Sequence, residues 1–199
     1  MPRQAVPPAT GQTTPATLDL PAVPSTAAQR PRPARYGEAA IRDAVADYSV
    51  SGDHLNALLR DDELDDDSPL RSSMVGPLDQ LTRHRLSTPL DVVRGVDYDA
   101  LPPDIDPGDV SRLRGEVLED PGFMSATVRD VPPGKFRDRP VYLRIHLSPG
   151  TCGARLDRYG SEFAAEREVL LARGTSMMVR EVYRDNDRWI LNCEVLPDE

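Results

Sequence analysis

Apolar residues in the first part of the chain, after a polar start, recur at a helical spacing. Residues 36–47 follow this pattern and predict an amphipathic helix. The segment Ser-Val-Ser-Gly-Asp at residues 49–53 predicts a break, and Asp53 is a suitable N-cap for a second helix over residues 54–60. A third helix is predicted over residues 74–86, where leucines alternate with polar residues.

The second half of the chain changes to the two-residue alternation of β-strands. Residues 141–147 alternate strictly, so their odd-numbered apolar residues share one face. Further strands are predicted over residues 91–96, 168–171, 176–183 and 189–196, with a turn at residues 184–188. Helices followed by strands predict an α+β fold. No G-x-G-x-x-G or P-loop sequence supports a βαβ nucleotide-binding fold.

The first 35 residues have a different composition from the rest. They contain eight of the 20 prolines, with Ala, Thr and Gln between them and few large apolar residues. Such a segment buries too little apolar surface to offset the entropy lost on ordering. We therefore predict a disordered tail or linker over residues 1–35 and one domain of ordinary size over residues 36–199.

The charge of the chain excludes some partners. The total is −9, and four arginines with one aspartate give residues 1–35 a charge of +3, so the remainder carries −12. An acidic domain is a poor match for nucleic acid or an anionic membrane. No apolar stretch approaches the ~20 residues that cross a bilayer. We expect a soluble protein that neither binds nucleic acid nor inserts into a membrane.

The cysteine and histidine pattern does not predict a metal site. Cys152 and Cys193 are far apart, and neither C-x-x-C nor H-E-x-x-H occurs. The three histidines are scattered along the chain. The sequence leaves open whether the two cysteines form a disulfide.

Two acids at the start of a predicted strand are candidates for chemistry. Glu166 and Glu168 flank Arg167, and side chains two residues apart on extended backbone point to the same side. Such a pair can act on one substrate. The alternative is that this Glu-x-Glu lies on a solvated helix, where the pattern is common.

Two arginines lie within predicted strands. Arg94 interrupts an apolar run and is followed by Gly95, and Arg144 lies on the polar face of residues 141–147. A buried guanidinium needs an anionic partner. Either arginine can satisfy this in a structural ion pair, or the two together can bind a pyrophosphate through their fork geometry.

The remaining candidate lies in the sequence Gly-Phe-Met-Ser-Ala-Thr at residues 122–127. Ser125 can orient a carboxylate by hydrogen bonding. It lacks the G-x-S-x-G surroundings of a nucleophilic serine.

Four short motifs occur in one order along the chain: Val-Val-Arg94-Gly-Val, Phe-Met-Ser125-Ala-Thr, Tyr-Leu-Arg144-Ile-His-Leu, and Glu166-Arg-Glu168-Val-Leu-Leu. In this order they resemble the arginine–serine–glutamate class of bacterial toxin mono-ADP-ribosyltransferases, and most closely the enzyme components of binary toxins. The resemblance implies a split β-sandwich of two small antiparallel sheets with N-terminal helices packed alongside. It also implies a cleft for NAD between the sheets.

The resemblance implies which residues bind NAD. Arg94 and Arg144 match arginines that contact the NAD phosphates, and Gly95 beside Arg94 belongs to the same set. Asn56 matches a helix asparagine that reaches NAD. NAD is the implied substrate, and no metal is implied.

The resemblance also implies which residues perform the reaction. Ser125 matches the serine that positions the catalytic glutamate, and Glu168 matches that glutamate. Glu166 and Phe163 match an acid and an aromatic residue of the loop that recognises the protein substrate. In this family Glu-x-Glu accompanies arginine acceptors, whereas Gln-x-Glu accompanies other acceptors. The expected activity is therefore transfer of ADP-ribose to an arginine of a target protein.

The expected biological setting follows from the same resemblance. We expect a monomeric toxin or effector, secreted or delivered into a target cell by a route that this sequence does not encode, because no classical signal peptide is visible. The target protein is not assigned. Two alternatives remain: a NAD glycohydrolase that transfers ADP-ribose to water, and a catalytically degenerate module that binds NAD or docks on a protein.

Removal of residues 1–35 tests the predicted tail. Because the expected site residues all follow residue 36, the truncated chain should hydrolyse NAD at the rate of the full chain. Initial rates of nicotinamide release by the two purified proteins provide the comparison. A large loss of activity would show that the segment is more than a linker.

Overall fold

The computed structural model describes residues 35–160 and 165–197. The helical part comes first and consists of α1 (Glu38–Arg60), a π-helical turn η1 (Arg71–Val75) and α2 (Gly76–Thr82). The strands follow: β1 (Leu90–Val96), β2 (Val117–Asp120), β3 (Met124–Thr127), β4 (Val141–Leu147), β5 (Gly153–Arg155), β6 (Glu168–Leu171), β7 (Thr175–Asp185) and β8 (Arg188–Val195). Three short 3₁₀ helices, η2 (Tyr98–Ala100), η3 (Ser111–Leu113) and η4 (Gly134–Asp138), lie in the connections. The α+β class predicted from the sequence is confirmed.

Helix α1 is continuous, so the predicted break at residues 49–53 and the predicted N-cap at Asp53 are wrong. The hydroxyls of Ser49 and Ser51 donate to the carbonyls of Ala46 (2.6 Å) and Asp47 (2.8 Å), one turn back along the same helix. Serine hydroxyls that bond in this way do not end a helix. Gly52 faces the ring of Tyr48, and a Cβ atom there would lie 3.0 Å from that ring. The glycine therefore serves side-chain packing inside the helix.

The third predicted helix is shorter than expected at its C-terminal end. Helix α2 ends at Thr82, whereas the prediction extended to Leu86. The amide of Leu86 donates to the carbonyl of Thr151 (2.9 Å), and the amide of Gly150 donates to the carbonyl of Leu86 (2.8 Å). Leu86 thus pairs with a loop far along the chain, which removes it from the helix.

The eight strands of residues 35–160 and 165–197 belong to one mixed sheet with the order β2-β7-β8-β4-β1-β3-β6-β5. Strands β4 and β8 are parallel, and the other neighbours are antiparallel. A single register pair, Val93 with Thr127, joins β1 to β3. The expected two antiparallel sheets are therefore a five-stranded and a three-stranded part of one sheet, connected at this narrow junction.

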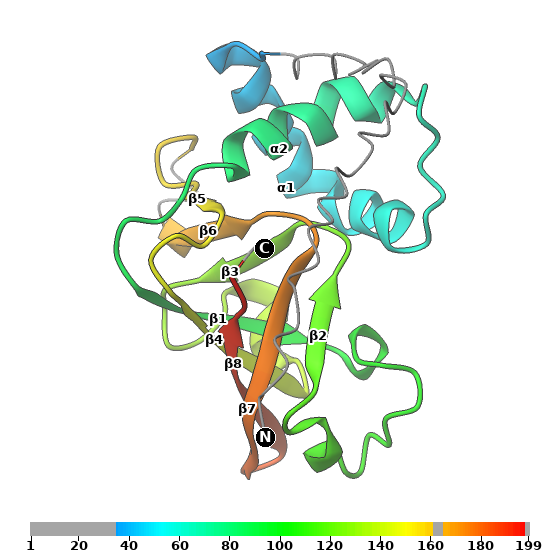
Figure 1. The fold of residues 1–199 in the computed structure, drawn as a ribbon, viewed down its shortest axis with the longest axis vertical. Helices are drawn as coiled ribbons and strands as arrows, with labels where there is room; N and C mark the ends of the chain where they lie inside the picture. Colours follow the sequence, from blue (N-terminus) through cyan, green and yellow to red (C-terminus); the bar gives the residue numbers. More distant parts are fainter. Residues whose placement is uncertain (1–34, 161–164, 198–199) are drawn as a thin grey trace, which may run out of the picture. The chain divides into compact units, whose positions relative to one another are not determined.

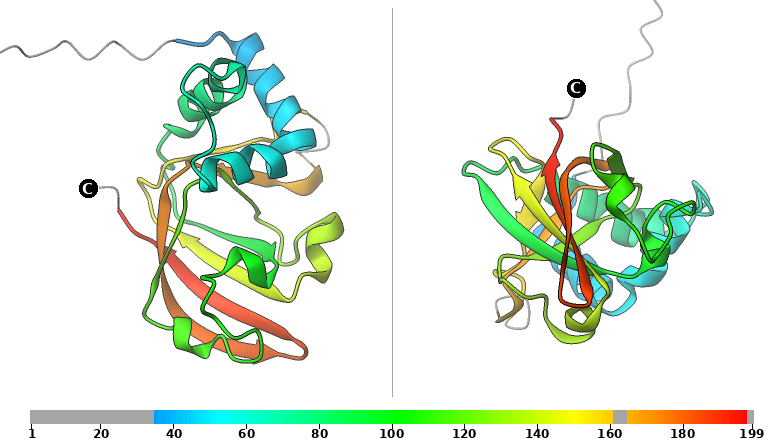
Figure 2. Two further views of the ribbon diagram at one scale, coloured as in Figure 1. Left: turned by 90° about the vertical axis from the view of Figure 1, so that its right-hand side faces the viewer. Right: turned by 90° about the horizontal axis from the view of Figure 1, so that it is seen from below.

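The helices cover the three-stranded part of the sheet (Figures 1 and 2). One apolar cluster joins α1 and α2 to Phe123, Ala154, Leu156 and Leu170. A second cluster lies among the strands and includes Val169 and Leu171. Strand β6 contributes alternate residues to both clusters, as the two-residue period of a strand requires. It is the layer between the two cores.

The sequence left open whether the two cysteines are bridged. In the structure no disulfide joins Cys193 to Cys152, and Cys193 is 3 % exposed. Burial raises the pKa of the Cys193 thiol to about 12. Within residues 35–160 and 165–197, no helix has both the length and the apolar character needed to cross a bilayer.

The position of β6 predicts a large cost for truncating Leu170, which is fully buried against the helices. Leu170→Ala should lower the free energy of unfolding by about 2–5 kcal/mol, as expected for a buried leucine. Val117→Ala, at a side chain that is 50 % exposed on β2, is the control and should change it by less than about 0.5 kcal/mol. Urea unfolding of the three proteins measures both. Equal midpoints for Leu170→Ala and the wild type would contradict the assigned packing.

Candidate active site

A pocket of about 380 Å³ lies beside the junction between β1 and β3. Its walls come from α1, β1, β3, residues 132–136 and the turn that precedes β6. Six of the residues that the sequence analysis selected line it: Asn56, Arg94, Gly95, Ser125, Glu166 and Glu168. Segments distant in the sequence thus converge on one cavity.

The hydroxyl of Ser125 donates a hydrogen bond to Oε1 of Glu168. The contact follows from the pairing of β3 with β6, in which Thr127 lies opposite Glu168 and Ser125 lies opposite Leu170. Ser125 and Glu168 are therefore diagonal neighbours on one face of the sheet, within reach of each other's side chains. The serine holds the carboxylate in one orientation toward the pocket.

Glu168 is half-buried, and its electrostatic surroundings are unusual for a carboxylate. Loss of hydration raises its pKa above the ordinary value of 4.5, and the neighbouring Glu166 raises it further. The hydrogen bond from Ser125 and the positive charge of Arg94 act in the opposite direction. A carboxylate that is poorly hydrated and partly compensated is well suited to stabilise a positive charge on a ligand.

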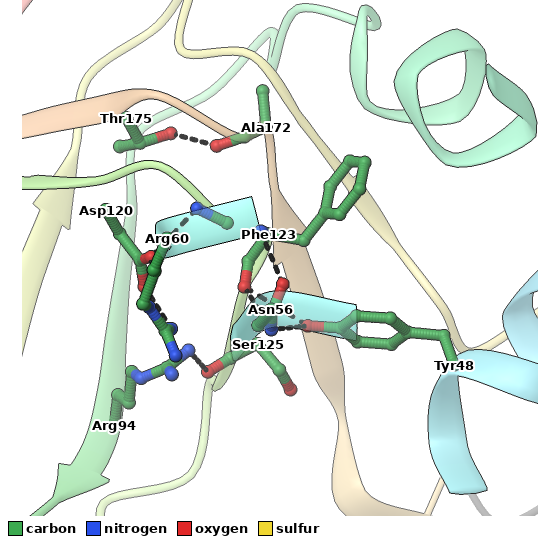
Figure 3. A network of polar contacts seen from close by, with 10 residues as sticks. Tyr48, Asn56, Arg60, Arg94, Asp120, Phe123, Ser125, Ala172 and Thr175 are labelled. Carbon is green, nitrogen blue, oxygen red and sulfur yellow. Dashed lines mark hydrogen bonds and ion pairs between the residues drawn. The ribbon is translucent and has the colours of Figure 1, made fainter. Parts of the chain in front are cut away.

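Arg94 lines the pocket from β1 and carries a half-buried guanidinium. Its Nη1 donates to the carbonyl oxygen of Ser125 (3.1 Å), as Figure 3 shows. Among the described residues, no carboxylate lies within ion-pair distance of it. The structural ion pair considered as an alternative is therefore not formed in this part of the chain. The charge is available to an anionic ligand.

Arg144 does not join the other candidates in this pocket. It is exposed on β4, and its Nη1 donates to the hydroxyl of Tyr183 (3.3 Å). Its register partner on β1 is Val93, which does line the pocket. The role of Arg144 in binding phosphate stays a prediction.

Glu166 lines the pocket, but the backbone that places it there differs from the predicted one. The predicted extended backbone from Glu166 to Glu168 is wrong, because Glu166 ends a helical turn and Arg167 has a left-handed backbone with φ of 53°. Both acids nevertheless line the same pocket. Phe163, the predicted aromatic residue of this loop, lies outside the described residues.

Asn56 is buried in a network that fixes the backbone before β3 (Figure 3). Its Nδ2 donates to the hydroxyl of Tyr48 and to the carbonyl of Phe123, both at 2.9 Å. Its Oδ1 accepts from the amide of Phe123 (2.8 Å). The amide group is therefore engaged within the protein, and its predicted contact with NAD stays a prediction. By holding the backbone of Phe123, Asn56 helps to position Ser125, which lies two residues after Phe123.

Tyr48 completes this network from the preceding turns of α1. Its hydroxyl donates to the carbonyl of Phe123 (3.1 Å), and its ring meets the ring of Phe123 edge-on with centroids 6.1 Å apart. Burial raises the pKa of Tyr48 to about 12, so the phenol keeps its proton in this role.

Gly95 allows the wall formed by η4 to approach β1. A Cβ atom at this position would lie 2.1 Å from the carbonyl oxygen of Phe136, so a larger residue would displace this segment. The segment also bridges to α1, because Nζ of Lys135 lies 2.6 Å from Oδ2 of Asp53. Sequence reasoning missed Lys135 and Phe136. The sequence Pro-Pro-Gly-Lys-Phe, with the only lysine and an aromatic residue after a rigid turn, was the available signal.

No metal cluster complements these groups in the described parts of the chain. Within residues 35–160 and 165–197, no three His, Cys, Asp or Glu side chains are arranged to hold an ion.

Comparison with known proteins assigns a family to this fold and site. The family model of the ADP-ribosyltransferase exoenzymes matches residues 36–196, and the chain therefore belongs to that family of toxins. The resemblance stated from the four sequence motifs is confirmed. A search of curated proteins finds no match.

Solved structures share the fold at low sequence identity. Plx2a, an ADP-ribosyltransferase toxin from Paenibacillus larvae, aligns with a TM-score of 0.67 and 19% identity over 80% of this chain and 87% of that chain. C3stau2 from S. aureus, solved with NAD, aligns with a TM-score of 0.66 and 21% identity over 82% and 89%. BECa, the ADP-ribosylating toxin of a binary enterotoxin of C. perfringens, was solved with NADH. It aligns with a TM-score of 0.66 and 18% identity over 79% of this chain and 43% of that chain.

The raised pKa of Glu168 predicts a pH-dependent stability. The folded-state pKa of Glu168 exceeds the unfolded-state value. Protonated Glu168 therefore contributes most to the free energy of unfolding below pH 4.5, and this contribution is lost as pH rises through the folded-state pKa. Glu168→Gln keeps an oxygen for Ser125 and removes the charge. Its Tm should exceed that of the wild type near neutral pH, and the difference should shrink as pH falls toward 4.5.

Thermal melts across this pH range provide the measurement. Glu116→Gln, at an exposed acid outside the pocket, is the control and should show no comparable gain. A Tm difference between Glu168→Gln and the wild type that does not change with pH would contradict the prediction.

Proposed function

We propose that this protein transfers ADP-ribose from NAD to an arginine of a target protein. The observation that carries the proposal is the convergence of Ser125, Glu168, Glu166 and Arg94 on one pocket. The pocket volume, about 380 Å³, is within the range of ligand sites, roughly 300–1,000 Å³. Membership of the exoenzyme family and the NAD and NADH bound in C3stau2 and BECa support the choice of substrate.

The residues of the pocket suit the groups that NAD presents. The guanidinium of Arg94 has no carboxylate partner among the described residues and can pair with a phosphate. Arg144 would add a second such contact from β4. Binding of the distant phosphates would hold the reacting bond in place, so remote binding energy would be used for orientation.

The transfer breaks the bond between nicotinamide and C1′ of the ribose. The bonding electrons leave with nicotinamide, and positive charge develops on the sugar. Glu168, held by Ser125, is the group that would stabilise this charge. Its poor hydration strengthens the interaction, because few water molecules compete for the carboxylate.

The new bond forms between C1′ and a guanidine nitrogen of the acceptor. That guanidinium is protonated near neutral pH and is a poor nucleophile until it loses a proton. Glu166, which lines the same pocket as Glu168, would align the guanidinium and accept that proton. The Glu-x-Glu motif supports arginine as the acceptor.

The remaining proposals concern organisation and setting. We propose residues 36–199 as the catalytic domain and residues 1–35 as a linker. We also propose a monomeric effector that is secreted or delivered to act on a protein of another cell, and the description of Plx2a as a toxin supports the action on another cell. The net charge of −12 over residues 36–199 supports a basic protein surface as the target, and not nucleic acid.

Substitution of Glu168 and of Glu166 separates cleavage of NAD from transfer to the acceptor. Glu168→Ala should abolish both NAD hydrolysis and transfer to agmatine, a soluble guanidine acceptor. Glu166→Ala should lower transfer by about 10²–10⁴-fold, the usual contribution of a general base, and retain part of the hydrolysis. Nicotinamide release and ADP-ribosyl-agmatine formation are measured on the same samples.

Circular dichroism and thermal melts of each variant control for folding. Near-wild-type turnover by Glu168→Ala would overturn the site. Hydrolysis by the wild-type chain with no product on agmatine or on any lysate protein would favour a NAD glycohydrolase. Absence of both activities would favour a degenerate binding module.

A further inference from the structure

The turn that carries Glu166 is attached to the end of β3 by three hydrogen bonds. The side chain of Arg129 donates to the carbonyl of Ala165 (3.4 Å). The hydroxyl of Thr127 donates to the carbonyl of Glu166 (2.6 Å), and the amide of Val128 donates to the carbonyl of Arg167 (3.2 Å). The last residue of β3 and the two residues that follow it thus bind three consecutive carbonyls of the turn.

Thr127 is the central and most buried member of this set. It is 3 % exposed, and its Oγ1 also accepts from the amide of Arg129 (3.1 Å). The hydroxyl therefore uses both its donor and an acceptor position, which fixes its rotamer. Loss of the hydroxyl would leave the carbonyl of Glu166 without this partner.

The turn requires such support because of its backbone. Arg167 adopts a left-handed conformation with φ of 53°, which is unfavourable for a residue with a Cβ atom. A different backbone conformation at Arg167 would change the position of Glu166 relative to the start of β6. Hydrogen bonds to the carbonyls on both sides of Arg167 oppose this relaxation.

We propose that Thr127 is a positioning residue that determines whether ADP-ribose passes to a guanidine acceptor or to water, an inference that rests on the proposed function. Ser125 and Thr127 lie on the same face of β3, two residues apart. Ser125 holds the carboxylate of Glu168, where the NAD bond breaks, and Thr127 holds the backbone of Glu166, where the acceptor is aligned. One strand thus positions the two acids separately.

Thr127→Val tests this division, because valine keeps the branched shape and removes the hydroxyl. The variant should lose about 10- to 100-fold in kcat/KM for agmatine, as expected when a reacting group is misplaced by about 1 Å. Hydrolysis of NAD without acceptor should stay within about threefold of the wild type, because Ser125 and Glu168 are unchanged. Thr127→Ser, which restores the hydroxyl, should recover most of the transfer.

Thr82→Val is the matched control. Thr82 is 1 % exposed, and its hydroxyl donates to the carbonyl of Leu78 (2.9 Å) within α2, outside the pocket. The control therefore removes a buried threonine hydroxyl from a carbonyl elsewhere in the fold. It should leave the ratio of transfer to hydrolysis at the wild-type value.

A second variant covers the case in which Thr127→Val does not fold. Arg129 is exposed, so Arg129→Ala removes its contact with the turn without disturbing the core. It should lower transfer in the same direction and by a smaller factor, with hydrolysis retained. Unchanged transfer in Arg129→Ala, where Thr127→Val is unfolded, would overturn the inference.

Amide hydrogen exchange of residues 165–168 provides a readout that does not depend on the acceptor. Thr127→Val should increase exchange in this segment, and Thr82→Val should not. If Thr127→Val lowers hydrolysis and transfer equally, or leaves their ratio and the exchange unchanged, the positioning role is wrong. If the wild-type chain modifies no guanidine acceptor, the proposed function fails first. The exchange data then decide whether Thr127 holds the turn.

Discussion

The constraint on which this structure depends is a carboxylate held where water is scarce. Glu168 lies at the start of β6, between a serine hydroxyl that orients it and a guanidinium that partly offsets its charge. Its raised pKa shows that hydration lost on folding is not fully replaced. A carboxylate that is only partly compensated lowers the stability of the fold. It is tolerated at sites where a ligand brings a positive charge. The surrounding elements keep the arrangement rigid.

The rigidity comes from a chain of contacts that leads from the helices to the sheet. Asn56 and Tyr48 of α1 hold the backbone of Phe123, and β3 begins at the next residue. Strand β3 pairs with β6 and joins β1 through a single register pair. The pocket lies beside this narrow junction, where side chains of β1, β3 and β6 line it. The helices therefore support the site indirectly, through the segment that they fix.

The sequence predicted the elements whose pattern is long and regular. Residues 141–147 alternate strictly and form β4. The predicted turn at residues 184–188 contains the two residues, 186 and 187, that connect β7 to β8. Strands β2, β3 and β5 have three or four residues each, too few for a period to be visible. The serines and Gly52 within α1 look locally like a helix end. The serine hydroxyls instead donate to carbonyls of the same helix, and Gly52 leaves room for the ring of Tyr48, which packs on Phe123. Local signals were overridden by packing.

The site shows the same division. Ser125, Arg94 and the two acids were selected from motifs, and the structure brings them to one pocket. The left-handed backbone of Arg167 was not predictable, because it depends on hydrogen bonds from β3, a strand about 40 residues away in sequence. Lys135 and Phe136 line the pocket only because Gly95 admits their backbone, a contact between distant segments. Arg144 remains on the exposed face of β4, apart from the pocket.

The place of β8 in the sheet has a consequence for the order of assembly. This strand follows the other strands of the described residues in sequence, yet it lies between β7 and β4, where it forms the parallel pair. During synthesis, or during threading of an unfolded chain from its N-terminus, β4 and β7 emerge before the strand that must separate them. The five-stranded part can close only when residues 188–195 are free to insert. Until then the N–H and C=O groups along one edge of β4 are unpaired and can pair with other strands.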